Sequence, residues 1–281
     1  MGQLDGKVAV VTGATSGIGE RIAEVFVAEG AAVVTAGRRE QEGRALESRC
    51  GAAVSFVRTD VTIEADVKAM IGHAIDRFGR LDCLVNNAGI PAPMTSIADV
   101  DMTSFDRVHA VNVRGVVLGM KYAVPVMRRQ GSGSVINIGS ASGVRSGIAG
   151  HAYASSKAAV IHLSRSVAAE LAGTLIRVNS LSPGGIVTGI YARNAGVDGP
   201  AADRVVGAVA DTFASLQPVA RAGITDDVAW AAVYLASDGS AFVSGHDLAV
   251  DGGSTAVGLG GWQRCLDLRH QLAERIRAEL S

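Results

Sequence analysis

A glycine-rich turn near the N-terminus constrains the fold of this chain more than any other feature. It runs from Thr12 to Gly19, after a β-branched run over 7–11 and before an amphipathic helical pattern over 20–29. Glycines at positions 13, 17 and 19 let the backbone turn sharply and approach a pyrophosphate, and the first N–H groups of the next helix attract anions. A strand, this turn and a helix in succession predict a dinucleotide-binding unit, although the spacing is G-x-x-x-G-x-G rather than G-x-G-x-x-G.

Apolar runs alternate with helical patterns along most of the chain. Strands are predicted at 7–11, 32–36, 54–58, 81–85, 134–139, 175–180 and 246–250, and helices at 20–29, 39–50, 64–78, 104–129, 153–171 and 226–237. This α/β order predicts one Rossmann-like domain over residues 1–253, doubly wound, with a mostly parallel seven-stranded sheet and helices on both faces. Residues 254–281 form a predicted helical extension whose apolar stripe packs on the domain or on a second subunit: Trp262, Leu266, Leu272, Ala273, Ile276 and Leu280.

Composition excludes several classes of protein. The net charge of -1 argues against partners bound through bulk charge, such as nucleic acid or an anionic membrane. The three cysteines have no metal or redox spacing, so we expect no metal site and a reducing compartment. No run of eighteen apolar residues and no N-terminal signal segment is present, so the expected location is cytoplasmic.

The end of the second predicted strand bears on the choice of cofactor. In NAD-specific sites an acidic residue near this point holds the ribose hydroxyls, but here the corresponding position is Gly37. Arg38 and Arg39 follow and can clamp a 2′-phosphate, so NADP(H) is favoured over NAD(H); the alternative is two solvated arginines at the start of a polar helix. Asp60, after the third strand, can accept from an adenine amino group or cap the next helix.

The stretch from Ser140 to Lys157 carries the predicted chemistry. Tyr153 and Lys157 are four residues apart and share one face of a helix, and a nearby ammonium favours the phenolate form of a tyrosine. Ser140 follows the fifth strand, where its hydroxyl can point at the same substrate oxygen. A lone Tyr-x-x-x-Lys is a common surface pair and a lone serine a common cap, so the interpretation rests on their agreement with the glycine turn.

Other polar and small residues complete the predicted site. Asn112 interrupts an apolar helix face, and it either bonds to backbone or holds a water beside Lys157. The segment 183–188 forms a turn suited to a nicotinamide amide, and 189–217 forms a predicted apolar lid over the cleft. His151 either lines the substrate pocket or is structural. The predicted substrate-binding residues are Ser142, Val144, His151 and Tyr191.

The chain resembles the short-chain dehydrogenase/reductase family because it contains a set of motifs together and in order. These are the Thr12–Gly19 turn, the Asn86–Gly89 segment, Asn112, Ser140, Tyr153-x-x-x-Lys157 and Pro183-Gly184. The resemblance covers residues 4–253 and implies that Asn112, Ser140, Tyr153 and Lys157 are catalytic. By this resemblance Tyr153 is the acid/base, Lys157 lowers its pKa and holds the nicotinamide ribose, Ser140 orients the substrate oxygen, and Asn112 holds a relay water. The tail after Gly253 is longer than is usual in the family, whose members commonly form homotetramers or dimers.

The predicted cofactor-binding residues, from the motifs and the resemblance together, are Gly13, Thr15, Ser16, Gly17, Ile18, Gly19, Gly37, Arg38, Arg39, Asp60, Val61, Asn87, Ala88, Gly89, Tyr153, Lys157, Pro183, Gly184, Ile186 and Thr188.

The predicted function is reversible hydride transfer between a nicotinamide and a secondary alcohol or ketone, with an apolar or cyclic substrate. One alternative is a non-catalytic dinucleotide sensor or scaffold, against which the intact Ser–Tyr–Lys set argues. Another is an enoyl reductase of related fold, in which the Tyr-to-Lys spacing is usually longer. The identity and stereochemistry of the substrate and the physiological direction lie beyond the sequence.

Overall fold

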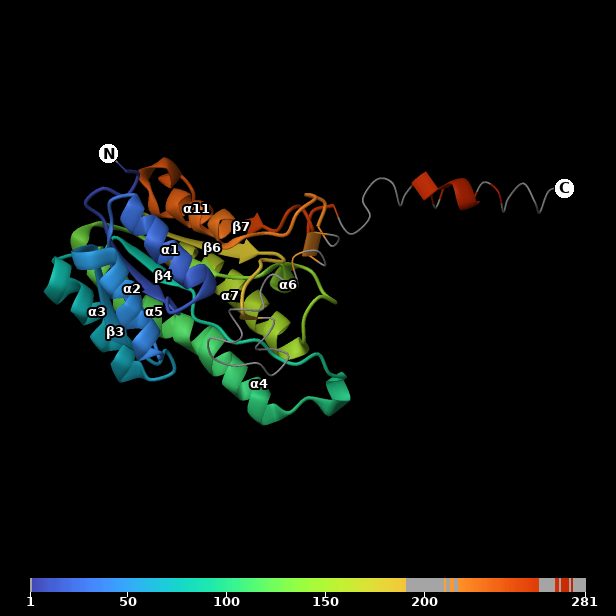
Figure 1. Ribbon diagram of the computed structural model, residues 1–281, viewed down its shortest axis with the longest axis horizontal. Coiled ribbons are helices and arrows are strands. Elements are labelled where there is room, and N and C mark those ends of the chain that lie inside the picture. Colours follow the sequence, from blue (N-terminus) through green and yellow to red (C-terminus); the bar gives the residue numbers. More distant parts are fainter. Residues whose placement is uncertain are drawn as a thin grey trace.

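The computed structural model describes residues 2–190, 210, 213–214, 217–257, 266–267, 269–272 and 274. Its centre is a seven-stranded sheet in the order β3-β2-β1-β4-β5-β6-β7 (Figure 1). Every neighbouring pair is parallel, so the sheet is parallel throughout rather than mostly. The strands are β1 (Val8–Thr12), β2 (Ala32–Gly37), β3 (Val54–Arg58), β4 (Cys83–Asn86), β5 (Ser132–Ile138), β6 (Leu175–Pro183) and β7 (Asp247–Val250).

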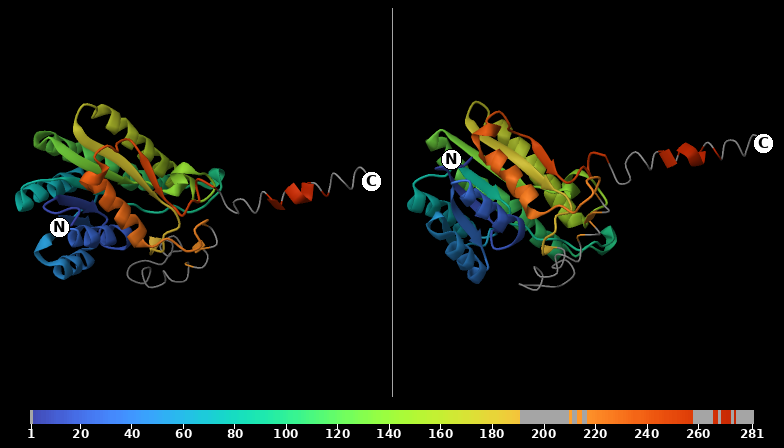
Figure 2. Two further views of the ribbon diagram at one scale, coloured as in Figure 1. Left: turned by 90° about the horizontal axis from the view of Figure 1, so that it is seen from above. Right: turned by 45° about the horizontal axis from the view of Figure 1, so that its top comes forward.

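Helices cover both faces of the sheet because successive strand residues point to opposite sides. Ala9 and Val11 of β1 belong to one buried cluster, and Val8 and Val10 belong to the other. The first face carries α1 (Gly17–Ala28), α2 (Glu40–Cys50) and α11 (Thr225–Ala236); the second carries α3 (Glu64–Phe78), α5 (Gly115–Gln130) and α7 (His151–Glu170) (Figure 2). The predicted Rossmann-like α/β fold is confirmed.

Shorter elements adjust the predicted boundaries. The predicted helix over 104–129 consists of α4 (Met102–His109), a π-helical turn (Ala110–Arg114) and α5, and the helix α6 (Ala141–Val144) follows β5. Single turns of 3-10 helix lie at Gly51–Ala53, Ile97–Asp99 and Asp238–Ser240. Strand β4 begins two residues later than predicted because the backbone N–H and carbonyl of Leu81 bond to the Gln130 side chain, each at 2.9 Å.

The chain after β7 forms an ordered turn before the tail. The Asp251 carboxylate accepts from the backbone N–H of Gly253 at 2.9 Å and from that of Thr255 at 2.8 Å. Most of the tail, including Trp262, lies outside the described residues, so the predicted helical extension and its packing stay a prediction.

Within the described residues, no helix is long and apolar enough to cross a membrane.

Candidate active site

A cavity of about 690 Å³ lies at the carboxyl ends of the strands, where β1 and β4 are neighbours although β2 and β3 follow β1 in the chain. This change of direction is where doubly wound folds bind ligands. All predicted cofactor-binding residues line the cavity except Gly19. Of the predicted catalytic residues, Ser140, Tyr153 and Lys157 line it, whereas Asn112 is fully buried behind the wall.

The glycine turn packs directly on the segment after β4. Gly13 has a φ of +67°, and a β-carbon placed on it would lie 2.8 Å from Cα of Ala88. The Asn87 amide donates to the carbonyls of Thr12 at 2.9 Å and Gly13 at 3.2 Å. A β-carbon on Gly19 would lie 2.3 Å from the Asn87 Nδ2, so this glycine serves close packing beneath the turn rather than lining the cavity.

The space in front of the turn fits a dinucleotide. A β-carbon on Gly17, whose φ is +61°, would meet within 4 Å only the Thr188 side chain, at 3.6 Å. Ser16 stands at the N-cap of α1 without a side-chain cap bond, and the first N–H groups of a helix favour phosphate. The turn therefore presents the backbone and the room that a pyrophosphate requires.

Two arginines border the end of β2. The Arg39 guanidinium bonds to the hydroxyls of Thr15, at 3.2 Å, and Ser16, so it braces the turn. Arg38 is exposed and lines the cavity. Burial by itself would raise the pKa of Asp60, but hydrogen bonds from Thr62 and the charges of Arg38 and Arg58 lower it overall. Asp60 is therefore a carboxylate beside Arg38.

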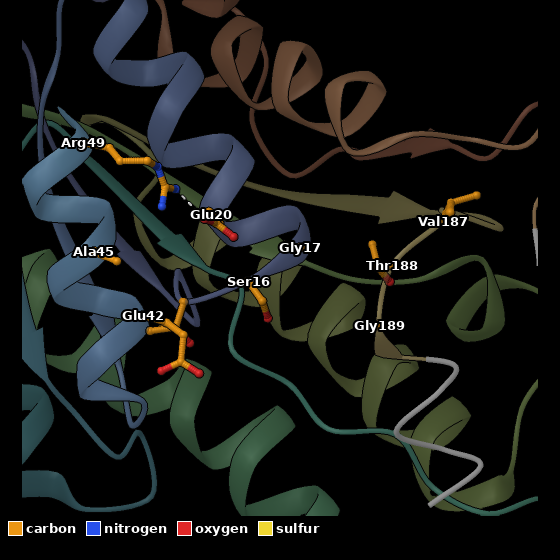
Figure 3. Close-up of a pocket in the computed structure, with 10 residues that line it drawn as sticks. Ser16, Gly17, Glu20, Glu42, Ala45, Arg49, Val187, Thr188 and Gly189 are labelled. Atoms are coloured by element: carbon orange, nitrogen blue, oxygen red, sulfur yellow. Dashed lines mark hydrogen bonds and ion pairs between the residues drawn. The ribbon is translucent and has the colours of Figure 1, made fainter. Parts of the chain in front are cut away.

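A smaller hollow of about 330 Å³ opens beside the turn, between α1, α2 and the segment after β6 (Figure 3). It shares Thr15, Ser16, Gly17 and Thr188 with the main cavity. Glu20 and Glu42 lie on its wall, and Arg49 is 2.5 Å from the Glu20 carboxylate. Two carboxylates make this hollow less suited to a phosphate than the main cavity.

Ser140, Tyr153 and Lys157 meet where β5 ends. The Ser140 hydroxyl caps α6, accepting from the Ser142 N–H at 3.1 Å, and it also bonds to the Tyr153 hydroxyl. One turn along α7, the Lys157 Nζ lies 5.6 Å from the centre of the Tyr153 ring and donates to the carbonyl of Ile138 at 2.8 Å. The Lys157 amine thus lies over the tyrosine ring while its hydrogen bond goes to the Ile138 carbonyl.

Burial dominates the protonation of this pair. It raises the pKa of Tyr153, and the hydrogen bond with Ser140 opposes that rise. It lowers the pKa of Lys157 to about 8. The direction for Tyr153 is opposite to the sequence-based expectation, because desolvation outweighs the hydrogen bond with Ser140, while the Lys157 amine donates to the backbone carbonyl of Ile138.

Asn112 has its partners inside the fold. Its Oδ1 accepts from the backbone N–H of Ile90 at 2.9 Å, and its Nδ2 donates to the Ile90 carbonyl at 3.1 Å and to the Ser156 hydroxyl at 3.0 Å. The side chain thus ties the loop after β4 to α7. Of the two interpretations open in the sequence, these contacts favour the backbone bond, and the predicted relay water stays a prediction.

The wall beyond Tyr153 is largely apolar. It includes Ile90, Ala92, Met94, Ile148 and Phe213.

Only some of the predicted substrate-binding residues line the cavity. Ser142 lines the cavity, but Val144 and His151 are exposed and do not, and Tyr191 lies outside the described residues, as does most of the predicted lid. Among the lining residues that sequence reasoning missed are Arg145 and Ser254, which a long-range contact brings together. Only the place of Arg145 inside the 140–157 stretch pointed to it.

Comparisons with known proteins agree with this geometry. Residues 13–255 match a family model described as enoyl-(acyl carrier protein) reductase. The chain is 42% identical to (+)-borneol dehydrogenase 2 of Salvia officinalis, over 91% of each chain. It is 41% identical to cis-4-hydroxycyclohexanecarboxylate dehydrogenase of Sinomonas cyclohexanicum, over 89% of this chain and 97% of that one.

A short-chain dehydrogenase reductase of Arabidopsis thaliana is 40% identical over 89% of this chain and 93% of its own. The match to the family model covers most of the chain, and these relatives are aligned over nearly their full length. The chain therefore belongs to the short-chain dehydrogenase/reductase family, and is an oxidoreductase that uses a nicotinamide dinucleotide, NAD or NADP, on a small-molecule alcohol or ketone.

Proposed function

We propose that this protein oxidises an apolar, cyclic secondary alcohol to its ketone, reversibly, with NADP(H). The observation that carries the proposal is the meeting of Ser140, Tyr153 and Lys157 on the wall of one cavity that also contains the glycine turn and an apolar surface. The names of two relatives, a borneol dehydrogenase and a hydroxycyclohexanecarboxylate dehydrogenase, support a cyclic alcohol.

The side chains divide the work around the reacting oxygen. The dinucleotide, bound along the turn, supplies the hydride acceptor or donor. The Tyr153 hydroxyl exchanges the proton with the substrate oxygen, and the Ser140 hydroxyl, bonded to Tyr153, orients that oxygen. Lys157, held by Ile138, presents its amine over the tyrosine ring, where it supports the nicotinamide ribose. Asn112 acts as a positioning residue for the loop at Ile90.

The preference for NADP(H) rests on the end of β2. Gly37 offers no carboxylate to ribose hydroxyls, and a β-carbon there would lie 2.7 Å from the Thr15 methyl group, so a larger residue is disfavoured. Arg38 lines the cavity next to it and supplies a cation for a 2′-phosphate.

The direct test is absorbance of the reduced nicotinamide with a panel of cyclic and acyclic secondary alcohols, each with NADP⁺ and NAD⁺. We expect turnover with cyclic alcohols, faster with NADP⁺ at limiting cofactor. Tight cofactor binding without turnover on any alcohol or ketone would instead support a non-catalytic sensor. Reduction of enoyl thioesters but of no ketone would support the enoyl reductase alternative.

Assembly and location are part of the same proposal. We infer a homo-oligomer, with a tetramer favoured over a dimer, in the cytoplasm. Light scattering during size-exclusion chromatography measures the mass of the assembly, and a monomeric mass would exclude the oligomer.

A further inference from the structure

We propose that Arg145 binds a carboxylate carried by the substrate, so that the substrate is a cyclic hydroxy acid or keto acid with an apolar ring. This inference rests on the proposed function and adds a second point of recognition to it. Arg145 follows α6, and it lines the same cavity as Tyr153.

The position of Arg145 is fixed by two contacts. Its backbone N–H donates to the Ala141 carbonyl at 2.8 Å, which closes α6 only a few residues after Ser140. Its Nη1 donates to the carbonyl of Ser254 at 2.9 Å, and Ser254 lines the cavity as well. The guanidinium is therefore part of the cavity wall on the β7 side, opposite the β2 side that carries Arg38.

The charge of Arg145 has no carboxylate partner among the described residues. The one hydrogen bond that its side chain makes to a described residue goes to a neutral carbonyl, although a guanidinium carries five N–H donors. The acidic residue of the adjoining turn, Asp251, accepts instead from Gly253, Thr255 and the Ser254 hydroxyl. A partly buried arginine whose counter-ion is not found among the described residues is well placed to bind an anion from outside.

The surroundings limit what that anion can be attached to. Ile148, Ala92 and Phe213 form an apolar wall on the same cavity. An apolar ring fits this wall, with its hydroxyl at Tyr153 and a carboxylate at Arg145. Two anchors of different chemistry would also fix which face of the carbinol carbon is presented.

The competing explanation is that Arg145 only ties α6 to the turn after β7. A purely structural role would affect every substrate alike, whereas a carboxylate contact affects only substrates that carry the carboxylate. The decisive comparison therefore uses one ring with two substituents, a hydroxycyclohexanecarboxylate and the methylcyclohexanol of the same geometry.

We would measure kcat and KM for both alcohols with wild type, Arg145→Gln and Arg145→Lys, with exposed Arg129→Gln as the matched control. We expect Arg145→Gln to raise KM for the carboxylate substrate about 10- to 100-fold, the range for a hydrogen bond to a charged group, while KM for methylcyclohexanol changes less than about threefold. Lysine should restore part of the loss, and Arg129→Gln should match wild type. Equal KM increases for both alcohols, or no increase for either, would overturn the proposal.

A binding measurement separates this inference from the proposed function. Cyclohexanecarboxylate has no hydroxyl to oxidise, so calorimetry with the cofactor-loaded protein needs no turnover. Binding by wild type that is lost in Arg145→Gln supports the carboxylate site even if no alcohol is oxidised, in which case the proposed function alone fails. Equal binding by both proteins, or by neither, contradicts the site.

Discussion

The two ends of the cavity are built in different ways. At the nucleotide end, the turns after β1, β2 and β4 contact one another through backbone, through Asn87 and through positions where only glycine fits. At the substrate end, side chains bond to segments far away in the chain: Arg145 donates to the Ser254 carbonyl, and Asn112 donates to the Ser156 hydroxyl. Backbone packing specifies the first end, and side-chain placement specifies the second.

This difference has a physical consequence. A dinucleotide needs N–H groups and space, which a tight turn supplies whatever the neighbouring side chains are. A substrate and a proton transfer need groups with particular protonation, which depend on burial and on long-range partners. Substitutions at the substrate end should therefore change chemistry and selectivity, while those at the nucleotide end should change stability and cofactor affinity.

The largest expected effect is at Tyr153. Replacing it by phenylalanine removes the proton-exchanging hydroxyl, so we expect kcat to fall by about 10³-fold, within the range for loss of a general acid/base. Cofactor affinity, measured by nucleotide fluorescence, should change less than threefold. A variant that kept near-normal kcat would contradict the assigned role of Tyr153.

Gly13→Ala tests the backbone nature of the other end. Gly13 has a positive φ of +67°, and an added β-carbon would lie 2.8 Å from Ala88 Cα. The alanine variant should therefore have a free energy of unfolding lower by about 2–4 kcal/mol, and its affinities for NADP⁺ and NAD⁺ should fall equally. Denaturant unfolding and cofactor titration measure these effects.

The matched control is Gly72→Ala in α3, where a β-carbon meets nothing within 4 Å. This change should stabilise the protein by about 0.8 kcal/mol, the helix preference for alanine. Equal stability changes for the two variants would show that the turn does not depend on glycine at position 13.

Arg38→Ala tests how much the charge of this side chain adds to cofactor binding at the nucleotide end, beyond what the backbone of the turn supplies. Loss of a guanidinium–phosphate contact should lower the affinity for NADP⁺ about 10- to 30-fold and leave the affinity for NAD⁺ nearly unchanged. Titration of both cofactors, with exposed Arg129→Ala alongside, measures the ratio. An equal loss for both cofactors would contradict a 2′-phosphate contact.

The smallest expected effect is the pH dependence from Lys157. Its pKa of about 8 in the fold lies below the ordinary 10.5, so between these values the unfolded chain binds more protons. The stability of wild type relative to Lys157→Met should therefore rise with pH, by about 1 kcal/mol from pH 8 to 9, and be lost as the pH falls through 8. A flat Lys157→Met difference would mean that burial does not depress this pKa.

Local pattern was enough to predict much of the molecule. The alternating apolar runs predicted all seven strands, because a buried parallel strand reads as a continuous apolar segment. The glycine turn predicted the position of the cavity, and helical spacing placed Tyr153 and Lys157 one turn apart. Periodicity, steric freedom at glycine and short spacing are properties of neighbours in the chain, so the sequence by itself determines them.

Only the tertiary structure decided which partners the side chains at the substrate end contact. It directed the Lys157 amine to Ile138, enclosed Asn112 between Ile90 and Ser156, and brought Arg145 to Ser254 across the sheet edge. It also reversed the expected pKa direction at Tyr153. These outcomes depend on desolvation and on partners distant in the chain, which come together only when the strands and helices have packed.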